Sequence, residues 1–484
     1  MDAMVPLHGG TSRKRLDNTR KTLRLDVAKV RERQHTGNQP VSGAMPVTVG
    51  DAAMRYLFIP VFLLLVPSRS DSQSDAPASE RFAPANRSTA HATVVADPRT
   101  FTEVTVGAAH VCGLSSDGRV WCWGASNAGQ TGAANRTAVA APQLIDAGER
   151  RYVTVTAGAM HTCAVTSSAR AECWGLAESG QLGSTRTPDD CVVFSCLSSP
   201  ATVETGVRFE TLAAGHAHTC AVADGRAWCW GKDDRGQLGI GMSGPSCRQS
   251  VCPLPTRIPD LPSVTAVVAG GGHSCALAAT GEAWCWGDNS RGQLGVGQPT
   301  LDHSRRPRRV ATSFRFTALT AGASHTCGLA TDGSVACWGD GSAGQLGADR
   351  APRSDVPLRE STAGRWTAVS AAARTTCALS ADGEAWCWGF GGGDRLGAPA
   401  PDRCDVGPCS RLAVRVPSVR GATRIAVGGV LACAIAGGDV QCWGWEPALS
   451  RGVLDSNFRH LLPGSPDASS RYRLRCPARP RHDC

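Results

Sequence analysis

Seven segments of this 484-residue chain repeat one pattern, and the repetition limits the fold more than any other property of the sequence. Each segment has a short apolar run, usually a histidine two residues before a cysteine, a turn, and a second cysteine followed by Trp-Gly. The first copy reads His110-Val-Cys112 and continues to Cys122-Trp-Gly. Repeats can share one continuous core, so the length does not require separate domains. The chain has 55 Gly and 29 Pro and lacks a long helical hydrophobic period, which predicts an all-β protein.

The two cysteines of each repeat are predicted to form a disulfide. They are ten positions apart in five repeats and nine apart in two, and turn sequences such as Asp224-Gly225 separate them. Directly opposed residues of antiparallel strands lie within disulfide range. The predicted pairs are Cys112–Cys122, Cys163–Cys173, Cys220–Cys229, Cys275–Cys285, Cys327–Cys337, Cys377–Cys387 and Cys433–Cys442.

The remaining cysteines also occur in local pairs. Three intervals between repeats are longer than the others, and each contains a further pair; a last pair lies in the tail. These pairs are Cys191–Cys196, Cys247–Cys252, Cys404–Cys409 and Cys476–Cys484. All 22 cysteines are thereby paired, which indicates an oxidising compartment. The three inserted pairs are expected on one rim of the fold, where loops commonly carry recognition.

A second motif follows the Trp-Gly of most repeats. Four copies read Gly-Gln-Leu-Gly, beginning at Gly180, Gly236, Gly292 and Gly344, and two more are close variants. Over about residues 91–446 the chain therefore resembles the regulator of chromosome condensation repeat family. The resemblance implies a seven-bladed β-propeller with four antiparallel strands per blade. Because the last repeat lacks this motif, we expect an N-terminal strand at residues 92–96 to complete blade seven and close the ring.

Five histidines occupy the same place in their repeats: His110, His161, His218, His273 and His325. Equivalent positions in successive blades lie apart around a ring, so they cannot converge on one substrate. We expect a structural role, in which a ring nitrogen bonds a neighbouring strand or loop.

A metal site built from one histidine and two cysteines is the alternative interpretation of these residues. Thr375 and Leu431 replace the histidine in the sixth and seventh repeats while both cysteines remain. Disulfides tolerate this replacement and a histidine-dependent metal site does not. We therefore predict neither a metal nor a cofactor.

Tryptophan follows the second cysteine in every repeat, and four repeats have another tryptophan before it. Residues that flank a cysteine on a strand point to the opposite face, so these rings are predicted to pack between blades. A carbohydrate-stacking platform is the alternative, and it requires some of the rings to be exposed.

An export signal is predicted at residues 54–70. Met54-Arg55 precedes an apolar run that ends at Val66, and small polar residues follow around Ser68. The run is too short for a stable membrane span. Residues 1–53 are then a disordered segment or a gene-model extension before a true start at Met54; a cytoplasmic arm before a signal anchor is the alternative. Residues 71–90 are a linker, 91–446 the propeller and 447–484 a C-terminal tail.

Charge and motifs favour binding over catalysis. The net charge of +9 is spread over 50 basic and 41 acidic residues without a long basic helix, so no nucleic-acid partner is predicted. The densest basic run, Arg305–Arg309, is interpreted as a solvated loop, and no local catalytic motif is present.

We therefore expect a monomeric, non-catalytic scaffold that is secreted, periplasmic or at the cell surface and binds an unidentified protein or glycan. The alternatives are a guanine-nucleotide exchange factor-like regulator, as the family name implies, and a cell-wall or polysaccharide-acting enzyme.

Overall fold

The computed structural model describes residues 99–133, 138–146, 148–186, 188–191, 194–241, 247–444 and 459–460. The chain divides into two compact units, Met1–Ser88 and Thr89–Cys484, and every described residue belongs to the second unit. The predicted signal peptide, the linker, the closing strand at 92–96 and the pair Cys476–Cys484 lie outside the described residues.

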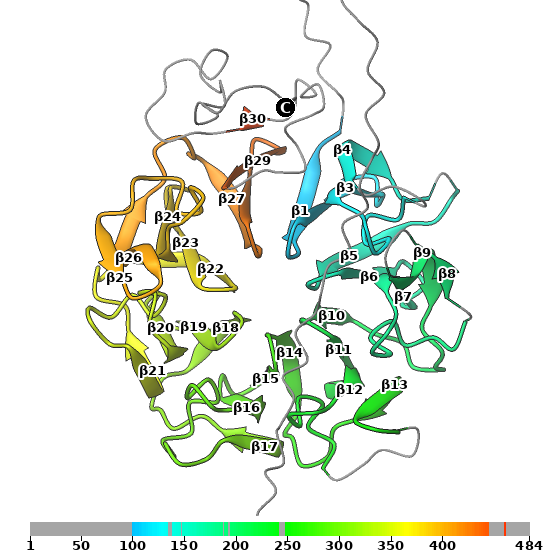
Figure 1. Ribbon diagram of the computed structural model, residues 1–484, viewed down its shortest axis with the longest axis horizontal. Coiled ribbons are helices and arrows are strands. Elements are labelled where there is room, and N and C mark those ends of the chain that lie inside the picture. The colour runs from blue at the N-terminus through cyan, green and yellow to red at the C-terminus, as the bar shows by residue number, and fades with distance from the viewer. Residues whose placement is uncertain are drawn as a thin grey trace, which may run out of the picture. The chain divides into compact units, whose positions relative to one another are not determined.

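The described chain forms seven β-sheets arranged in a ring, and each sheet is one blade (Figure 1). Blade one consists of β1 (Phe101–Val106), β2 (His110–Ser115), β3 (Val120–Ala125) and β4 (Ala138–Leu144). Blade two consists of β5 (Tyr152–Ala157), β6 (His161–Thr166), β7 (Ala171–Leu176), β8 (Asp189–Asp190) and β9 (Ser195–Thr202). Blade three consists of β10 (Thr211–Ala214), β11 (His218–Ala223), β12 (Arg226–Lys232) and β13 (Val251–Arg257).

Blade four consists of β14 (Val264–Ala269), β15 (His273–Ala278), β16 (Ala283–Asp288) and β17 (His303–Arg309). Blade five consists of β18 (Phe316–Ala321), β19 (His325–Ala330), β20 (Val335–Asp340) and β21 (Arg353–Arg359). Blade six consists of β22 (Trp366–Ala372), β23 (Thr375–Ser380), β24 (Ala385–Phe390), β25 (Asp402–Cys404) and β26 (Gly407–Arg415). Blade seven consists of β27 (Ala422–Val427), β28 (Leu431–Ala436), β29 (Asp439–Gly444) and β30 (Arg459–His460).

The seven-bladed all-β prediction is confirmed, and the register explains the repeat. Within blade four, for example, Cys275 is directly opposite Cys285 on the antiparallel pair β15 and β16. The glycine after the tryptophan, Gly287, has a φ of 100°. A Cβ at this position would lie 2.6 Å from the Gly272 carbonyl oxygen, so the Trp-Gly step lets the third strand approach the turn between the first two strands.

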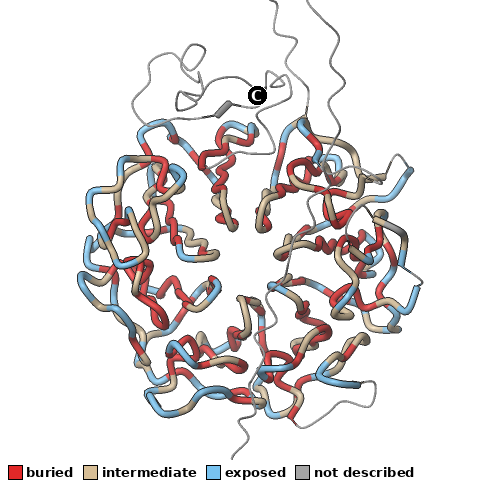
Figure 2. The backbone as a smooth tube through the Cα atoms, viewed as in Figure 1, coloured by how far each residue is buried: buried red, intermediate tan, exposed pale blue. Residues whose placement is uncertain are grey.

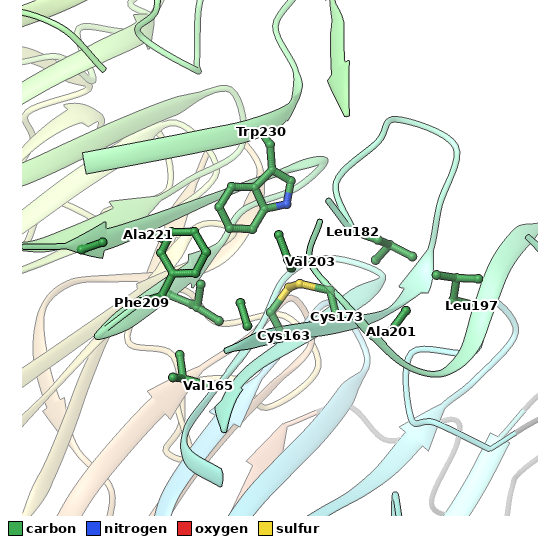
Figure 3. Packing of buried hydrophobic residues seen from close by; sticks show 13 residues of the cluster. Cys163, Val165, Cys173, Leu182, Leu197, Ala201, Val203, Phe209, Ala221 and Trp230 are labelled. Carbon is green, nitrogen blue, oxygen red and sulfur yellow. A yellow bond between two sulfur atoms is a disulfide. The ribbon is translucent and has the colours of Figure 1, made fainter. Parts of the chain in front are cut away.

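Apolar side chains fill the junctions between blades. Buried residues run along the strands of every blade, and exposed residues lie mostly at the outer edge of the ring (Figure 2). The seven tryptophans that follow the second cysteines are fully buried: Trp123, Trp174, Trp230, Trp286, Trp338, Trp388 and Trp443. In Figure 3, Trp230 and Phe209 of blade three face Cys163, Cys173 and Leu182 of blade two within one cluster. The prediction that these rings pack between blades is confirmed. Each sheet is therefore covered by the side chains of its neighbouring blades.

Blade seven meets blade one through side chains and backbone hydrogen bonds. Phe101 and Trp123 of blade one share a buried cluster with Leu431 and Ile435 of blade seven. The Phe101 amide donates to the Gly438 carbonyl over 2.9 Å. The described fourth strand of blade seven is β30, which pairs with β29 in parallel. It occupies the place that we assigned to residues 92–96, so closure by an N-terminal strand is not confirmed.

Candidate functional site

The repeated histidines bond to the following blade. His110 Nε2 lies 2.9 Å from Thr162 Oγ1, and the Thr162 hydroxyl donates to the Gln130 carbonyl over 2.8 Å. Trp174 Nε1 donates to the same carbonyl. Since the threonine proton is used, His110 Nε2–H is the donor to Oγ1. Four residues, two from each blade, thus tie blades one and two together, and the expected structural role of the histidine is confirmed.

The same unit occurs at five successive junctions, with histidine-to-hydroxyl distances of 2.8–3.0 Å. Burial lowers the pKa of His110 and His273 to about 4, and that of His161, His218 and His325 to about 3. These imidazoles are therefore neutral at neutral pH, and each lies in a separate junction of the ring.

Among the described residues, the two junctions that flank blade seven lack the bond between histidine and hydroxyl, and both partners of that bond change together. At the junction of blades six and seven, Thr375 stands for the histidine and Ala432 for the hydroxyl residue. At the junction of blades seven and one, the corresponding residues are Leu431 and Val111. A buried Nε2–H without an acceptor is costly, so the loss of one partner is matched by the loss of the other.

Ten cysteine pairs lie at disulfide distance. The seven pairs within blades have Cα separations of 4.0–4.1 Å and are fully or almost fully buried. The three inserted pairs are also close, with Cα separations of 4.1–5.9 Å. Oxidation of all these pairs stays a prediction. Among the described residues, no group of three His, Cys, Asp or Glu side chains is placed to hold a metal ion.

The tryptophans before the second cysteines are half-buried rather than exposed: Trp121, Trp228, Trp284 and Trp386. The Arg99 guanidinium lies over the Trp121 ring, 4.3 Å from its centroid, and Trp386 contacts Trp366 edge-on. The large apolar side chains exposed among the described residues are Val153, Val356 and Leu412. The exposed aromatic platform that glycan stacking requires is thus not found on these strands.

The basic run Arg305–Arg309 lies on strand β17, so its interpretation as a loop is wrong, and acidic neighbours pair most of its charge. Arg305 contacts Asp233 of blade three at 3.4 Å, Arg306 contacts Asp260, and Arg309 contacts Glu282 at 2.8 Å. A run that is largely neutralised locally offers little attraction to a polyanion, which agrees with its interpretation as an ordinary solvated segment.

In blades one to six, one end of each blade carries both the turn between the first and second strands and the loop between the third and fourth, because these strands pair antiparallel. In blade four these are residues 270–272 and 289–302. We call this end of the ring the loop face. Each of the three inserted cysteine pairs joins the segment that follows the third strand to the beginning of the fourth strand, and hence lies on the loop face, as the sequence predicted.

The inserted hairpins reach over the junctions. A Cβ on Gly129 of blade one would lie 3.2 Å from Cys191 Sγ of blade two. A Cβ on Gly180 of blade two would lie 2.8 Å from Pro253 Cα of blade three, and one on Gly344 of blade five 2.5 Å from the Ser410 carbonyl of blade six. The glycine motif of one blade therefore supports the inserted segment of the next.

The loop face also has two connected depressions. The central one, of about 420 Å³, is lined by the ends of the innermost strands and the first turns of all seven blades, with mostly small side chains. A side cavity of about 330 Å³ lies between blades three and four and contains His216, Lys232 and Arg235. The side cavity and the central depression share His216, Gly271 and Ala323 in their lining, so the two adjoin each other. A third cavity, of about 390 Å³, adjoins Cys404 at the junction of blades five and six.

Sequence reasoning missed the side cavity between blades three and four, and it missed the pairing of each histidine with a hydroxyl of the next blade. The second had a visible signal: Thr or Ser follows the histidine position in repeats two to six, whereas Val111 and Ala432 stand there in repeats one and seven. The histidine of one repeat pairs with the hydroxyl of the next repeat, so the relationship is not apparent within any single copy. The cavity gave no signal, since it forms where turns and loops of neighbouring blades meet.

Comparisons with known proteins agree with the fold. The chain matches the family model described as RCC1-like domain over residues 149–461, and models of the regulator of chromosome condensation repeat over 101–130 and 117–165. It is 34% identical over 254 residues to human E3 ubiquitin-protein ligase HERC2, which is 50% of this chain and 5% of HERC2. It is 30% identical over 259 residues to the ultraviolet-B receptor UVR8 of Arabidopsis thaliana, which is 52% of this chain and 56% of UVR8.

Solved structures show the same ring at lower identity. Yeast RCC1 (Prp20), in its structure bound to Kap60, superposes with a TM-score of 0.59 at 21% identity, over 68% of this chain and 78% of that chain. Human WBSCR16 superposes with a TM-score of 0.58 at 19% identity, over 68% and 85%. At these identities the likeness shows the fold alone, and the matched segments cover less than two thirds of HERC2 and UVR8.

Proposed function

The chain belongs to the RCC1-like domain family, and we propose that it is an exported, non-catalytic scaffold that holds a partner protein or glycan on its loop face. Relatives of this fold include a light receptor, and a yeast protein whose binding to Gsp1p and histones has been described. The ligase activity of HERC2 is not carried over, because the match covers 5% of that protein.

One observation carries the binding assignment. The repeated histidines, hydroxyls, glutamines and tryptophans join the blades to one another. The three inserted hairpins, which differ between blades, lie on the loop face together with the cavities. Irregular loops held by a rigid scaffold are where binding proteins place recognition.

The ten cysteine pairs at disulfide distance support export, since such pairs persist in oxidising compartments. Among the described residues, no helix is long and apolar enough to cross a membrane.

Cell fractionation with N-terminal sequencing tests the export. We expect the mature protein outside the cytoplasm, beginning shortly after residue 70 and without peptides from residues 1–53. Retention in the cytoplasm with free thiols would overturn the proposal and favour the guanine-nucleotide exchange alternative.

Affinity capture from the envelope fraction tests the binding face. One variant replaces the residues between the cysteines of the three hairpins with Gly and Ser while it keeps the cysteines. A matched control replaces the turn residues Asp117, Asp332 and Asp382, which are exposed at the opposite end of their blades. We expect the captured partner to be lost with the first variant and retained with the second; the reverse result contradicts the assignment of the loop face.

A further inference from the structure

We propose that the side cavity between blades three and four, with the central depression beside it, binds an acidic segment of a partner protein through Arg235 and His216. This inference rests on the proposed binding function and names the site and the chemistry of the partner. Arg235 comes from the loop after β12, and His216 from the turn between β10 and β11.

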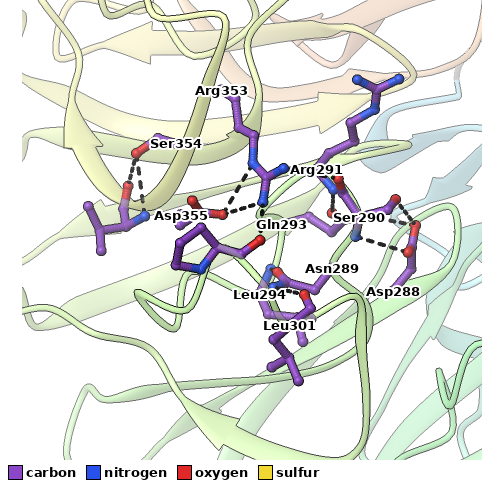
Figure 4. Close-up of polar contacts among 12 residues, drawn as sticks. Asp288, Asn289, Ser290, Arg291, Gln293, Leu294, Leu301, Arg353, Ser354 and Asp355 are labelled. Carbon is purple, nitrogen blue, oxygen red and sulfur yellow. Dashed lines mark hydrogen bonds and ion pairs between the residues drawn. The ribbon is translucent and has the colours of Figure 1, made fainter.

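The acidic residues of the cavity are already occupied. Asp234 accepts a hydrogen bond from Gln237 Nε2 at 3.0 Å and pairs with Lys232 Nζ at 2.9 Å. Asp288 accepts from Gln293 Nε2 at 2.8 Å and from the backbone and hydroxyl of Ser290 (Figure 4). These two carboxylates therefore hold their own loops in place through hydrogen bonds.

The basic side chains of the cavity, by contrast, have donors to spare. Arg235 and His216 are exposed, and among the described residues neither side chain makes a hydrogen bond or a salt bridge at contact distance. The Arg235 charge lies near enough to Asp234 to interact with it electrostatically, and the Arg235 backbone amide donates to Gln237 Oε1 over 2.8 Å. Arg291 holds the equivalent place in blade four, and no dashed line reaches its guanidinium in Figure 4. A guanidinium whose hydrogen-bond donors are free, beside carboxylates that already accept hydrogen bonds within their own loops, is suited to an incoming carboxylate.

The surroundings favour a protein segment over a polyanion. The central depression continues from His216 across Gly271 and Ala323, and small apolar side chains line most of it. A loop with an apolar side chain beside an Asp or Glu would fill both spaces. A nucleic acid or a sulfated glycan would instead bring several negative charges against Asp234 and Asp288, and it would leave the apolar depression unfilled.

The test begins with a phage-displayed library of cyclic heptapeptides, selected on the immobilised, oxidised full chain. We expect the enriched peptides to carry Asp or Glu next to an apolar residue. Each enriched peptide is then synthesised with its acid and with the matching amide. The acid form should bind at least tenfold more tightly, and Arg235→Gln should remove most of that difference, with a smaller loss for His216→Gln.

Arg226→Gln is the matched control, because Arg226 is exposed at the other end of blade three. It should leave peptide affinity unchanged, and all variants should keep the unfolding midpoint of the original chain. Enriched peptides without an acid preference, or equal affinity for the Arg235→Gln variant, overturn the inference and leave the proposed function standing. A library without any binder counts against both. Stronger Arg235-dependent binding of a heparin oligosaccharide or single-stranded DNA overturns the assignment to a protein partner.

Discussion

The imidazole of His325 in blade five donates a hydrogen bond to the hydroxyl of Thr376 in blade six, with 2.9 Å between Nε2 and Oγ1. Thr376 in turn donates to the Gln345 carbonyl of blade five over 2.9 Å. Both side chains are buried, so neither can exchange its partner for water. Two consecutive blades therefore depend on each other through one pair of residues.

Thr376→Val should destabilise the protein by about 1–3 kcal/mol, because it leaves His325 Nε2–H and one bond of the Gln345 carbonyl unsatisfied. The double variant His325→Leu with Thr376→Val copies the Leu431 and Val111 of the last junction, and it should recover part of this loss. Denaturant unfolding of the two single variants and the double variant measures the coupling. Strictly additive losses would show that the two side chains act independently.

Acid should weaken the fold through the five buried histidines. Burial lowers the pKa of His110 and His273 from 6.5 to about 4 in the folded state, whereas the unfolded chain keeps the ordinary value. The unfolded state therefore binds more protons between these values, so the stabilisation is complete above pH 6.5 and is lost as the pH falls towards 4. The loss at pH 4 is on the order of 3 kcal/mol for each of these two histidines.

Unfolding free energies at pH 7.5, 6 and 5 test this dependence. Stability should change little between pH 7.5 and 6.5 and fall more steeply towards pH 5, and the double variant His325→Leu with Thr376→Val should show a shallower fall than the original chain. A flat profile between pH 7.5 and 5 would contradict the account.

Gly322→Ala should destabilise blade five, because the added Cβ would lie 2.2 Å from His325 Cε1. We expect a cost of about 1–3 kcal/mol from overpacking. Blade six already has Ala372 at the matching position, and there Thr375 replaces the histidine. Adding His325→Thr to Gly322→Ala should therefore restore part of the stability in thermal unfolding; a further loss would show that the clash is not the cause.

Mass spectrometry after alkylation should find no free thiol in the exported protein, and reduction should add one hydrogen for each of the 22 cysteines. Replacing Cys377 and Cys387 together with alanine should cost roughly 2.5–3 kcal/mol for a loop of about ten residues. Free thiols or bound zinc in the native protein would refute the predicted pairing.

The facing cysteines could be predicted from a local rule repeated seven times: a hairpin turn sets the register, and the register sets which residues are opposed. The seven-bladed ring was implied by the resemblance of the repeated motifs to a known family. The sequence also predicted that a ring nitrogen of each histidine bonds a neighbouring strand or loop. It did not predict that the bond crosses to the next blade, as from His325 to Thr376, since that depends on which blade is the neighbour. The fourth strand of blade seven could not be predicted, because β30 pairs in parallel and lies 15 residues beyond Gly444 in a segment without the motif. The pairing of Arg305 with Asp233 depends on contacts between loops of different repeats, which no periodicity encodes.

The histidine and hydroxyl pairs determine which blades can be neighbours in the ring. Blades two to five carry both a hydroxyl towards the preceding blade and a histidine towards the following one, so they are interchangeable in this respect. In blade one, Val111 holds the hydroxyl position, and the preceding blade seven has Leu431 at the histidine position. In blade seven, Ala432 holds the hydroxyl position, and the preceding blade six has Thr375 at the histidine position. Duplication or loss of an interior blade would keep every junction matched, whereas moving blade seven would leave buried donors without acceptors. Although the sheets form a closed circle, the two junctions of blade seven therefore mark where the order of the blades begins and ends.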